Sequence, residues 1–416
     1  MISLKATLII YSRKFGVLTL MRVLSLILML CQNVLLLKCL SLNEVGQYYL
    51  LATISYVGNA AVFVGADLNL QRLAASDFAL SKFSLSGAID YFFKSAAFGA
   101  IVVFSFASIY FFVTGAGTGS WVAAVMCMVT SVSLYASSVL KNILQLDGKI
   151  KFVGAIAFSE AALKFLAVVA VTQAGGTTGL AVVSGIAAAS AVAAAMGALI
   201  ARKKITSHPR RIYWPGFLPL AKRIAPVGGS GILNWAQLQA YRPLMIGTLG
   251  GEVLGAVALL STLGSTVANA VYGIIAQIKN PQIYHSGGKS SLAYLKLVSI
   301  IALVLAILSI PASYVFLSVT HHLDLLPYLT IVAAGVLLES GNAALGLAIN
   351  HSNATGQNLW FISLAGILGC SVSLTFLLTN FSQLEPHLKI TSALIVGQGL
   401  TALLACLYAF LYVGKK

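Results

Sequence analysis

The chain has 416 residues, of which 59% are hydrophobic and only 9% are charged. A soluble domain has about 25% charged residues, so this composition excludes a chain that presents its whole surface to water. The formal net charge of +16 would suggest nucleic acid as a partner of a soluble protein. Long continuous apolar runs, instead of short strands of alternating polarity, predict an all-α integral membrane protein and exclude a β-barrel.

Apolar runs long enough to cross a bilayer, which takes about 20 residues in a helix, recur along the whole chain. We predict twelve transmembrane helices, at residues 15–38, 47–68, 91–113, 119–140, 152–173, 178–200, 225–248, 253–276, 292–318, 325–348, 358–380 and 388–413. No small-residue cleavage site follows the first run, so we interpret it as a span and not as a signal peptide. The five cysteines form no CxxC pair, so neither a disulfide framework nor a zinc site is indicated.

Lys and Arg are distributed unevenly between the two sides that this helix count defines. With the N-terminus inside, 21 of the 26 bases lie in cytoplasmic segments and only Lys38 and Lys389 lie outside. The remaining bases, Arg22, Lys164 and Arg242, fall within spans. Because cytoplasmic loops carry an excess of Lys and Arg, we predict that both termini are cytoplasmic. The net charge is then a topology signal, and no nucleic acid partner is expected.

A basic polar stretch near the middle of the chain divides it into two halves. We interpret residues 201–224 as a cytoplasmic linker between an N-terminal six-helix lobe, 1–200, and a C-terminal six-helix lobe, 225–416. A weak internal repeat agrees, because SLNEVGQYYLLATI aligns with LGGEVLGAVALLST and places Glu44 and Glu252 208 residues apart. Parallel repeats of six helices are a recurring plan of transporters, which hold the substrate between the repeats.

Two arginines lie inside corresponding helices of the two halves. Arg22 is in the inner part of the first span, and Arg242 is in the outer part of the seventh. Arginine keeps its charge in a poorly hydrated site and can bind phosphate through two parallel hydrogen bonds, so both are candidates for binding an anion. The alternative is that Arg22 extends toward the inner headgroups and that Arg242 pairs with an acid or with backbone carbonyls.

Three further ionisable residues within spans are candidates for function, because charge inside a membrane is costly. Glu160 and Lys164 are four residues apart and therefore share a helix face. They form either a self-neutralising pair or a site in which Lys164 binds the anion and Glu160 couples to a proton. Glu339 is either an ion-coupling acid or the partner of an arginine. Asp67 and Asp90, at the inner ends of their helices, are expected to face water.

Several short motifs do not support a more specific chemistry. GGKSS at 287–291 lacks the leading glycine of a phosphate-binding loop and follows a membrane helix, so ATP binding is rejected. His321, His322 and Asp324 do not have the spacing of a metal site, and no cofactor or metal is expected. Small-residue spacing permits close helix contact at Gly247, Gly251 and Gly255. Helices can break or kink at Pro226, Pro243 and Pro311, and broken helices often line substrate sites.

Four segments resemble one family of transporters. SLNEVGQYYL at 41–50 is similar to a conserved stretch after the first helix of polysaccharide-unit flippases in the MATE-like MOP superfamily. YRPLMIGTLGGEVLGAVALL, KNPQIY and NILQLDGKIKF are similar to other segments of that family. The resemblance implies a MATE-like transporter fold, alternating access, and a cationic cavity for the diphosphate of an undecaprenyl-linked oligosaccharide. Arg22 and Arg242 match that role by helix and charge.

The expected protein is therefore a flippase, not an enzyme, in the bacterial inner membrane. It would move a lipid-linked O-antigen or other polysaccharide unit to the outer leaflet, with membrane lipids and other assembly proteins, such as a polymerase and a chain-length regulator, as partners. A drug or cation antiporter of the same superfamily is the first alternative, although such a site should be lined by acids. A membrane glycan polymerase or ligase is the second, but the short outer links leave little room for an active site. A purely structural membrane protein would not need isolated buried arginines.

Overall fold

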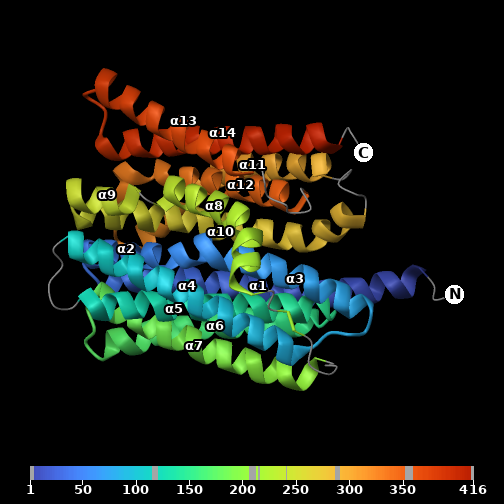
Figure 1. Cartoon of the computed structure of the whole chain (residues 1–416). Coiled ribbons are helices and arrows are strands. Elements are labelled where there is room, and N and C mark those ends of the chain that lie inside the picture. The colour runs from blue at the N-terminus through green and yellow to red at the C-terminus, as the bar shows by residue number, and fades with distance from the viewer. Residues whose placement is uncertain are drawn as a thin grey trace. The chain divides into compact units, whose positions relative to one another are not determined.

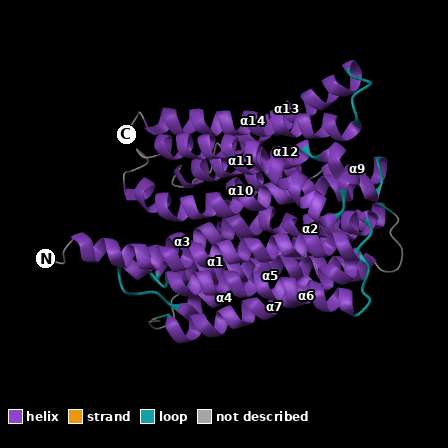
Figure 2. Ribbon diagram, turned by 180° about the vertical axis from the view of Figure 1, so that it is seen from behind, coloured by secondary structure: helices purple, strands orange, loops and turns teal. Residues whose placement is uncertain are grey.

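The protein is built from helices joined by short loops (Figure 1, Figure 2). A computed structural model describes residues 4–114, 120–205, 212–213, 216–239, 241–285, 291–351 and 359–413. Within these ranges every regular element is a helix. The α-helices are α1 (Leu4–Cys39), α2 (Leu42–Gly58), α3 (Val64–Ala79), α4 (Leu85–Val113), α5 (Ser120–Leu146), α6 (Ile150–Gln173), α7 (Gly179–Lys204), α8 (Phe217–Gln239), α9 (Tyr241–Thr248), α10 (Gly251–His285), α11 (Ser291–Thr320), α12 (Thr330–His351), α13 (Leu359–Asn380) and α14 (Pro386–Val413).

Two short helices of other types complete the set, a π-helix at Asn59–Phe63 and a 3-10 helix at Leu323–Tyr328. Side chains cap some helices as their sequences favour. Ser84 is the N-cap of α4, and its hydroxyl accepts a hydrogen bond from the Gly87 N–H at 3.3 Å. Part of the predicted linker, at 206–211 and 214–215, lies outside the described residues, as do residues 287–290 of the GGKSS segment.

The helices confirm the predicted fold class. Ten helical segments of the described chain are long and apolar enough to cross a membrane, and each coincides with a predicted span. The two other predicted spans, 225–248 and 325–348, correspond to α8 with α9 and to α12. Residue 240 of the first lies outside the described residues, and the apolar stretch described in α12 is the shorter Thr330–Ala344. The chain is thus a multi-pass membrane protein.

Two compact units divide the chain. Unit 1 contains Met1–Leu35 and Ile54–Ala225, and unit 2 contains Leu36–Thr53 and Pro226–Lys416. The division after Ala225 falls at the end of the predicted linker. The end of α1 and the first part of α2, however, group with the C-terminal residues and not with residues 1–200. Each unit is therefore built from two separate segments of the chain.

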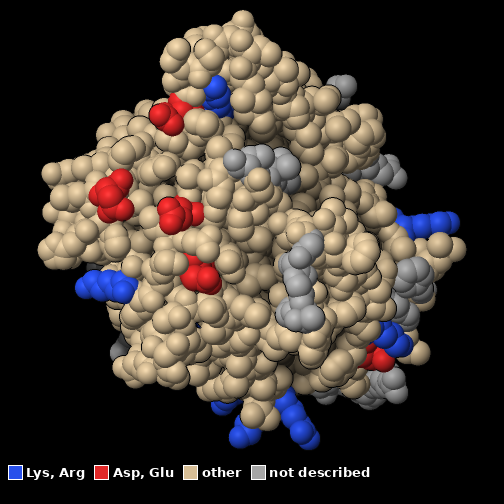
Figure 3. All heavy atoms as spheres, turned by 90° about the vertical axis from the view of Figure 1, so that its left-hand side faces the viewer, with Lys and Arg blue, Asp and Glu red and all other residues tan. Residues whose placement is uncertain are grey.

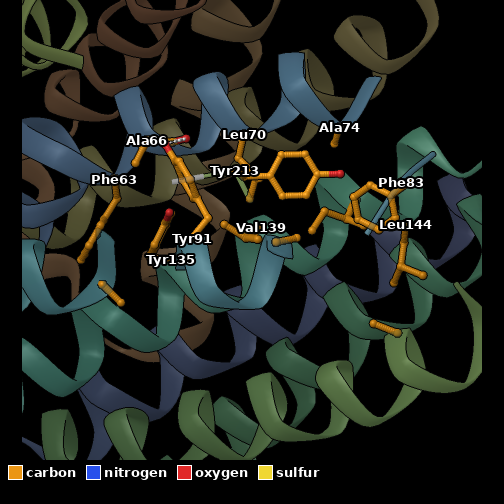
Figure 4. Close-up of a cluster of buried hydrophobic side chains, with 14 of the residues drawn as sticks. Phe63, Ala66, Leu70, Ala74, Phe83, Tyr91, Tyr135, Val139, Leu144 and Tyr213 are labelled. Atoms are coloured by element: carbon orange, nitrogen blue, oxygen red, sulfur yellow. Dashed lines mark hydrogen bonds between the residues drawn. The ribbon is translucent and has the colours of Figure 1, made fainter. Parts of the chain in front are cut away.

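Aromatic side chains form the centre of unit 1, as Figure 4 shows. Phe63, at the end of the π-helix, stacks on Tyr135 of α5 with ring centroids 4.3 Å apart. The hydroxyl of Tyr91 on α4 donates to the carbonyl of Ala66 on α3 at 3.0 Å. A Cβ added at Gly99 would overlap the Phe63 ring, so the missing side chain makes room for it. These contacts connect α3, α4 and α5 around the π-helix.

The three prolines that the sequence analysis singled out all lie within described helices. Pro226 lies inside α8, Pro243 inside α9 and Pro311 inside α11. α8 is described to Gln239 and α9 from Tyr241, and residue 240 between them lies outside the described residues.

Small residues let α2 and α10 approach closely within unit 2. A Cβ added at Gly46 would overlap the backbone of Gly251, and one added at Gly255 would overlap the backbone of Leu42. The two windows of the predicted repeat therefore contact each other in space. Gly247, the third glycine of the predicted series, lies on α9. A Cβ added there would have no neighbouring atom within 4 Å. Only Gly251 and Gly255 of that series contribute to the close crossing.

We expect Gly255→Val to destabilise unit 2, because the new side chain meets backbone atoms of α2 that cannot rotate away. Overpacking of this kind costs about 1–3 kcal/mol and sometimes more. The measurement is the thermal unfolding temperature of the purified protein in detergent. Gly247→Val is the matched control, because it adds the same side chain where there is open space. Equal unfolding temperatures for the two variants would contradict the predicted role of the crossing.

Candidate functional site

Glu160 and Lys164 form an ion pair inside unit 1. Both lie on α6, and Lys164 Nζ is 2.6 Å from Glu160 Oε1. Glu160 is only 8% exposed. The pair has the geometry that their four-residue spacing predicts, since residues i and i+4 lie on one helix face.

Helix α5 adds two more groups to the same carboxylate. Glu160 Oε2 accepts hydrogen bonds from Ser137 Oγ at 2.5 Å and from Lys141 Nζ at 3.2 Å. The sequence analysis counted Lys141 among the cytoplasmic bases because the predicted span ends at residue 140. α5 continues to Leu146, so Lys141 lies on the helix, and its ammonium group pairs with Glu160 on α6.

Arg22 of α1 also belongs to this region. It lies within electrostatic range of Glu160, and its Nε atom is buried without a hydrogen-bond partner. Lys141 and Lys164 thus contact one carboxylate and Arg22 attracts it at longer range, and we call these three bases with Glu160 the unit 1 cluster. The three bases outnumber Glu160 and Asp67, a second acid within electrostatic range of Lys141, so an excess of positive charge remains.

Asp67 lies nearby and is buried, contrary to the prediction that it faces water. It is 8% exposed, and its Oδ2 accepts hydrogen bonds from Ser138 Oγ at 2.9 Å and from Asn142 Nδ2 at 2.7 Å. The prediction was wrong because α5 covers this part of α3 with polar side chains that bind one of the two carboxylate oxygens. Asp90 was also expected to face water, and it is partly exposed and paired with Lys94 at 2.9 Å.

Arg242 lies in unit 2, two residues into α9, and is only 9% exposed. Its Nε donates to the hydroxyl of Tyr241 at 3.2 Å, and its Nη1 donates to the hydroxyl of Thr53 at 3.0 Å. Its guanidinium carbon lies 5.5 Å from the centre of the Tyr49 ring and 5.7 Å from that of Tyr241. Aromatic faces at such distances attract a cation.

No carboxylate among the described side chains forms an ion pair with Arg242. The sequence analysis gave pairing with an acid or with carbonyls as the alternative to an anion site. Hydroxyls and rings hold the guanidinium instead, so its charge is not cancelled by these contacts. Sequence reasoning missed Tyr49 and Thr53. Their position in the repeat window that aligns with the start of α10 is the only signal that could have suggested them.

Glu339 of α12 has amide neighbours in unit 2. Its Oε1 accepts from Asn342 Nδ2 at 3.4 Å, and Asn342 Oδ1 accepts from Asn234 Nδ2 of α8 at 3.1 Å. The neighbouring Ser340 shares a 2.6 Å hydrogen bond with Tyr272. No ion pair links Glu339 to a basic side chain in the described part of the chain. The predicted pairing with an arginine is therefore not found among these residues.

Figure 3 shows one end of the helices, where most side chains are uncharged and bases lie mostly toward the edge of the face. Four acids in unit 2 are at or near the links predicted to be outside, Glu44, Glu252, Asp324 and Glu385. A scarcity of bases at these links is what the predicted orientation requires. Among the described residues, no group of three or more His, Cys, Asp or Glu could hold a metal ion.

The basic groups of each unit can bind an anion. Lysine ammonium groups and a buried guanidinium donate charge-assisted hydrogen bonds to phosphate oxygens, which are stronger than neutral ones. Unit 1 offers Lys141, Lys164 and Arg22 on three different helices, and unit 2 offers Arg242 beside two hydroxyls.

No family model matches the sequence, and no curated protein matches it by sequence similarity. Solved structures of MATE transporters match it over nearly its whole length. A multidrug resistance MATE family transporter of the MOP superfamily, in an outward-facing conformation, has a TM-score of 0.68 at 14% identity and covers 97% of this chain and 96% of its own.

Two further structures agree. A mutant of the Vibrio cholerae MATE transporter VcmN has a TM-score of 0.66 at 13% identity, with 97% of both chains covered. The eukaryotic MATE transporter AtDTX14 has a TM-score of 0.65 at 12% identity and covers 96% of this chain and 95% of its own. The chain is an all-α membrane protein with the MATE transporter fold. Identities this low show the fold alone.

Proposed function

We propose that this protein is a flippase that moves a lipid-linked oligosaccharide, attached through a diphosphate, across the bacterial inner membrane. One observation carries the proposal, the excess of positive charge held within the helices. In unit 1 two partly buried lysines pair with Glu160 and Arg22 lies within its electrostatic range, and in unit 2 hydroxyls and aromatic rings hold the buried Arg242. Cations in such surroundings attract an anion, and a diphosphate headgroup supplies one.

The physical problem that such a protein solves is desolvation. An ionised group cannot enter hydrocarbon unaided, because burying an unpaired charge costs many kcal/mol. Bases held inside the protein replace the water around the phosphates. Alternating access then exposes the bound group first to one side of the membrane and then to the other, as in transporters built from repeated bundles.

The energy source in this proposal is an ion gradient or the consumption of the product, since the only phosphate-loop resemblance, GGKSS, was rejected. Glu160 and Glu339 are the proposed ion-coupling residues. Glu339 supports this role because its carboxylate has an amide neighbour and no basic partner among the described side chains. Membrane lipids, a glycan polymerase and a chain-length regulator are the proposed partners, and both termini are proposed to be cytoplasmic.

The experiment that tests the flippase is the surface-glycan profile of cells that lack the gene, together with the leaflet position of the lipid-linked intermediate. We expect no glycan units at the surface and the intermediate on the inner leaflet. Re-expression of the wild-type chain should restore both. A single unit that still reaches the surface would indicate a polymerase, and an unchanged profile would contradict both glycan functions.

The alternative function is a drug or cation antiporter. Two observations favour it. A structural neighbour is named as a multidrug resistance transporter, and Glu339 has an amide neighbour but no basic partner among the described side chains. In that case proteoliposomes should accumulate a cationic dye when an ion gradient is imposed, and Glu339→Gln should abolish accumulation. The flippase predicts no dye accumulation under the same conditions.

A further inference from the structure

We infer that the Glu160 carboxylate holds the place of a substrate phosphate group in unit 1 and is displaced when that group binds. The inference rests on the proposed function and deepens it, because it names how an anion enters the unit 1 cluster. It makes Glu160 an internal competitor of the substrate.

The donors around Glu160 are those that a phosphate group needs. Both carboxylate oxygens are occupied, one by Lys164 at 2.6 Å and the other by Ser137 at 2.5 Å and Lys141 at 3.2 Å. These donors come from two helices, α5 and α6, and converge on one acceptor group. Two ammonium groups and a hydroxyl directed at one point form a phosphate site as readily as a carboxylate site.

The charge balance favours the phosphate over the carboxylate. A carboxylate supplies one negative charge, whereas a diphosphate that joins a lipid to a sugar supplies about two, one on each phosphate group. The cluster has three bases, and the Nε atom of Arg22 is buried without a hydrogen-bond partner. A larger anion with more oxygens can satisfy Arg22 as well as the two lysines, which Glu160 by itself does not do.

Asp67 shows that a buried acid in unit 1 need not take this role. Its Oδ2 accepts from the neutral side chains of Ser138 and Asn142, and Lys141 acts on it only through electrostatic attraction. No ammonium group donates to it directly among the described residues. Asp67 therefore has the same charge and similar burial as Glu160 without its phosphate-like donors, and it is the matched control.

The test is the binding of inorganic pyrophosphate to the full chain in lipid nanodiscs, measured by isothermal titration calorimetry. Glu160→Gln should tighten binding by about tenfold or more, within the range of measured couplings between sites. Asp67→Asn should tighten it by clearly less, because only general electrostatics changes. Lys164→Gln should weaken binding.

Two outcomes would overturn the inference and leave the proposed function intact. The first is that Glu160→Gln binds pyrophosphate with the affinity of the wild type. The second is that Asp67→Asn tightens pyrophosphate binding as much as Glu160→Gln does. Pyrophosphate binding by none of these proteins, or unchanged binding in Lys164→Gln, would overturn the anion site of the proposed function as well.

Glu160→Gln leaves Lys164 and Lys141 without a counter-charge, so its folding needs an independent check. Glu160→Asp keeps the charge but shortens the side chain by one methylene, which loosens its hydrogen bonds to the lysines. The inference predicts that this variant binds pyrophosphate more tightly than wild type, by a smaller factor than Glu160→Gln. Unchanged or weaker binding in a monodisperse Glu160→Asp protein would contradict it.

Discussion

Arg242→Ala is expected to reduce transport of the lipid-linked substrate by about thirtyfold or more, since truncating a buried, hydrogen-bonded charge costs about 2–5 kcal/mol. The substitution removes the buried charge together with its hydrogen bonds to Tyr241 and Thr53. Arg242→Lys should retain part of the activity, because it keeps the charge but loses the planar arrangement of donors.

The measurement is restoration of surface glycan in cells that lack the gene, with the inserted amount of each variant quantified in the membrane fraction. Tyr241→Phe is the control, because it removes one hydroxyl and keeps the ring that faces the guanidinium. It should lose little activity. Wild-type transport by a stably inserted Arg242→Ala protein would remove Arg242 from the site.

Lys164→Met is expected to reduce transport by about tenfold or more, within the range of charge-pair couplings measured at interfaces. Methionine is apolar and similar in length, so it fills the space of the lysine stem while the shortest of the ion pairs to Glu160 is lost. Lys141 and Ser137 still hold the carboxylate, and the cluster keeps too little charge for a diphosphate.

Lys94→Met is the matched control for this variant. Lys94 pairs with Asp90 four residues earlier on α4 at 2.9 Å, so it has the same spacing and a similar distance. Its side chain is 46% exposed, compared with 17% for Lys164. Because exposed pairs contribute about 0–1 kcal/mol, transport should not change. Equal losses in both variants would mean that Lys164 acts only through protein stability.

The spans and the Glu160–Lys164 pair could be predicted because both depend on residues that are close in the sequence. An apolar window of about 20 residues predicts a membrane helix whatever lies elsewhere in the chain. Residues four apart on a helix must be neighbours. All twelve predicted spans therefore have a helical counterpart among the described residues, and that of the seventh is α8 with α9.

The membership of the unit 1 cluster could not be predicted in the same way. Lys141 is 19 residues from Glu160, and Arg22 is on a different helix, so their proximity depends on how the helices pack. A lysine just after the predicted end of a span indicates membrane topology. The sequence analysis therefore did not relate Lys141 to Glu160. Asp67 was misplaced for the same reason, because its burial comes from Ser138 and Asn142 on α5.

By itself the sequence determined that this is an all-α membrane protein and where its long apolar helices lie along the chain. Those properties follow from local composition and helix periodicity, since backbone groups in lipid must be satisfied within each segment. Only the tertiary structure decided what surrounds each charge. Thr53 meets Arg242 across 189 residues, and Gly46 meets Gly251 and Gly255, because helix packing brings together segments that no local pattern connects.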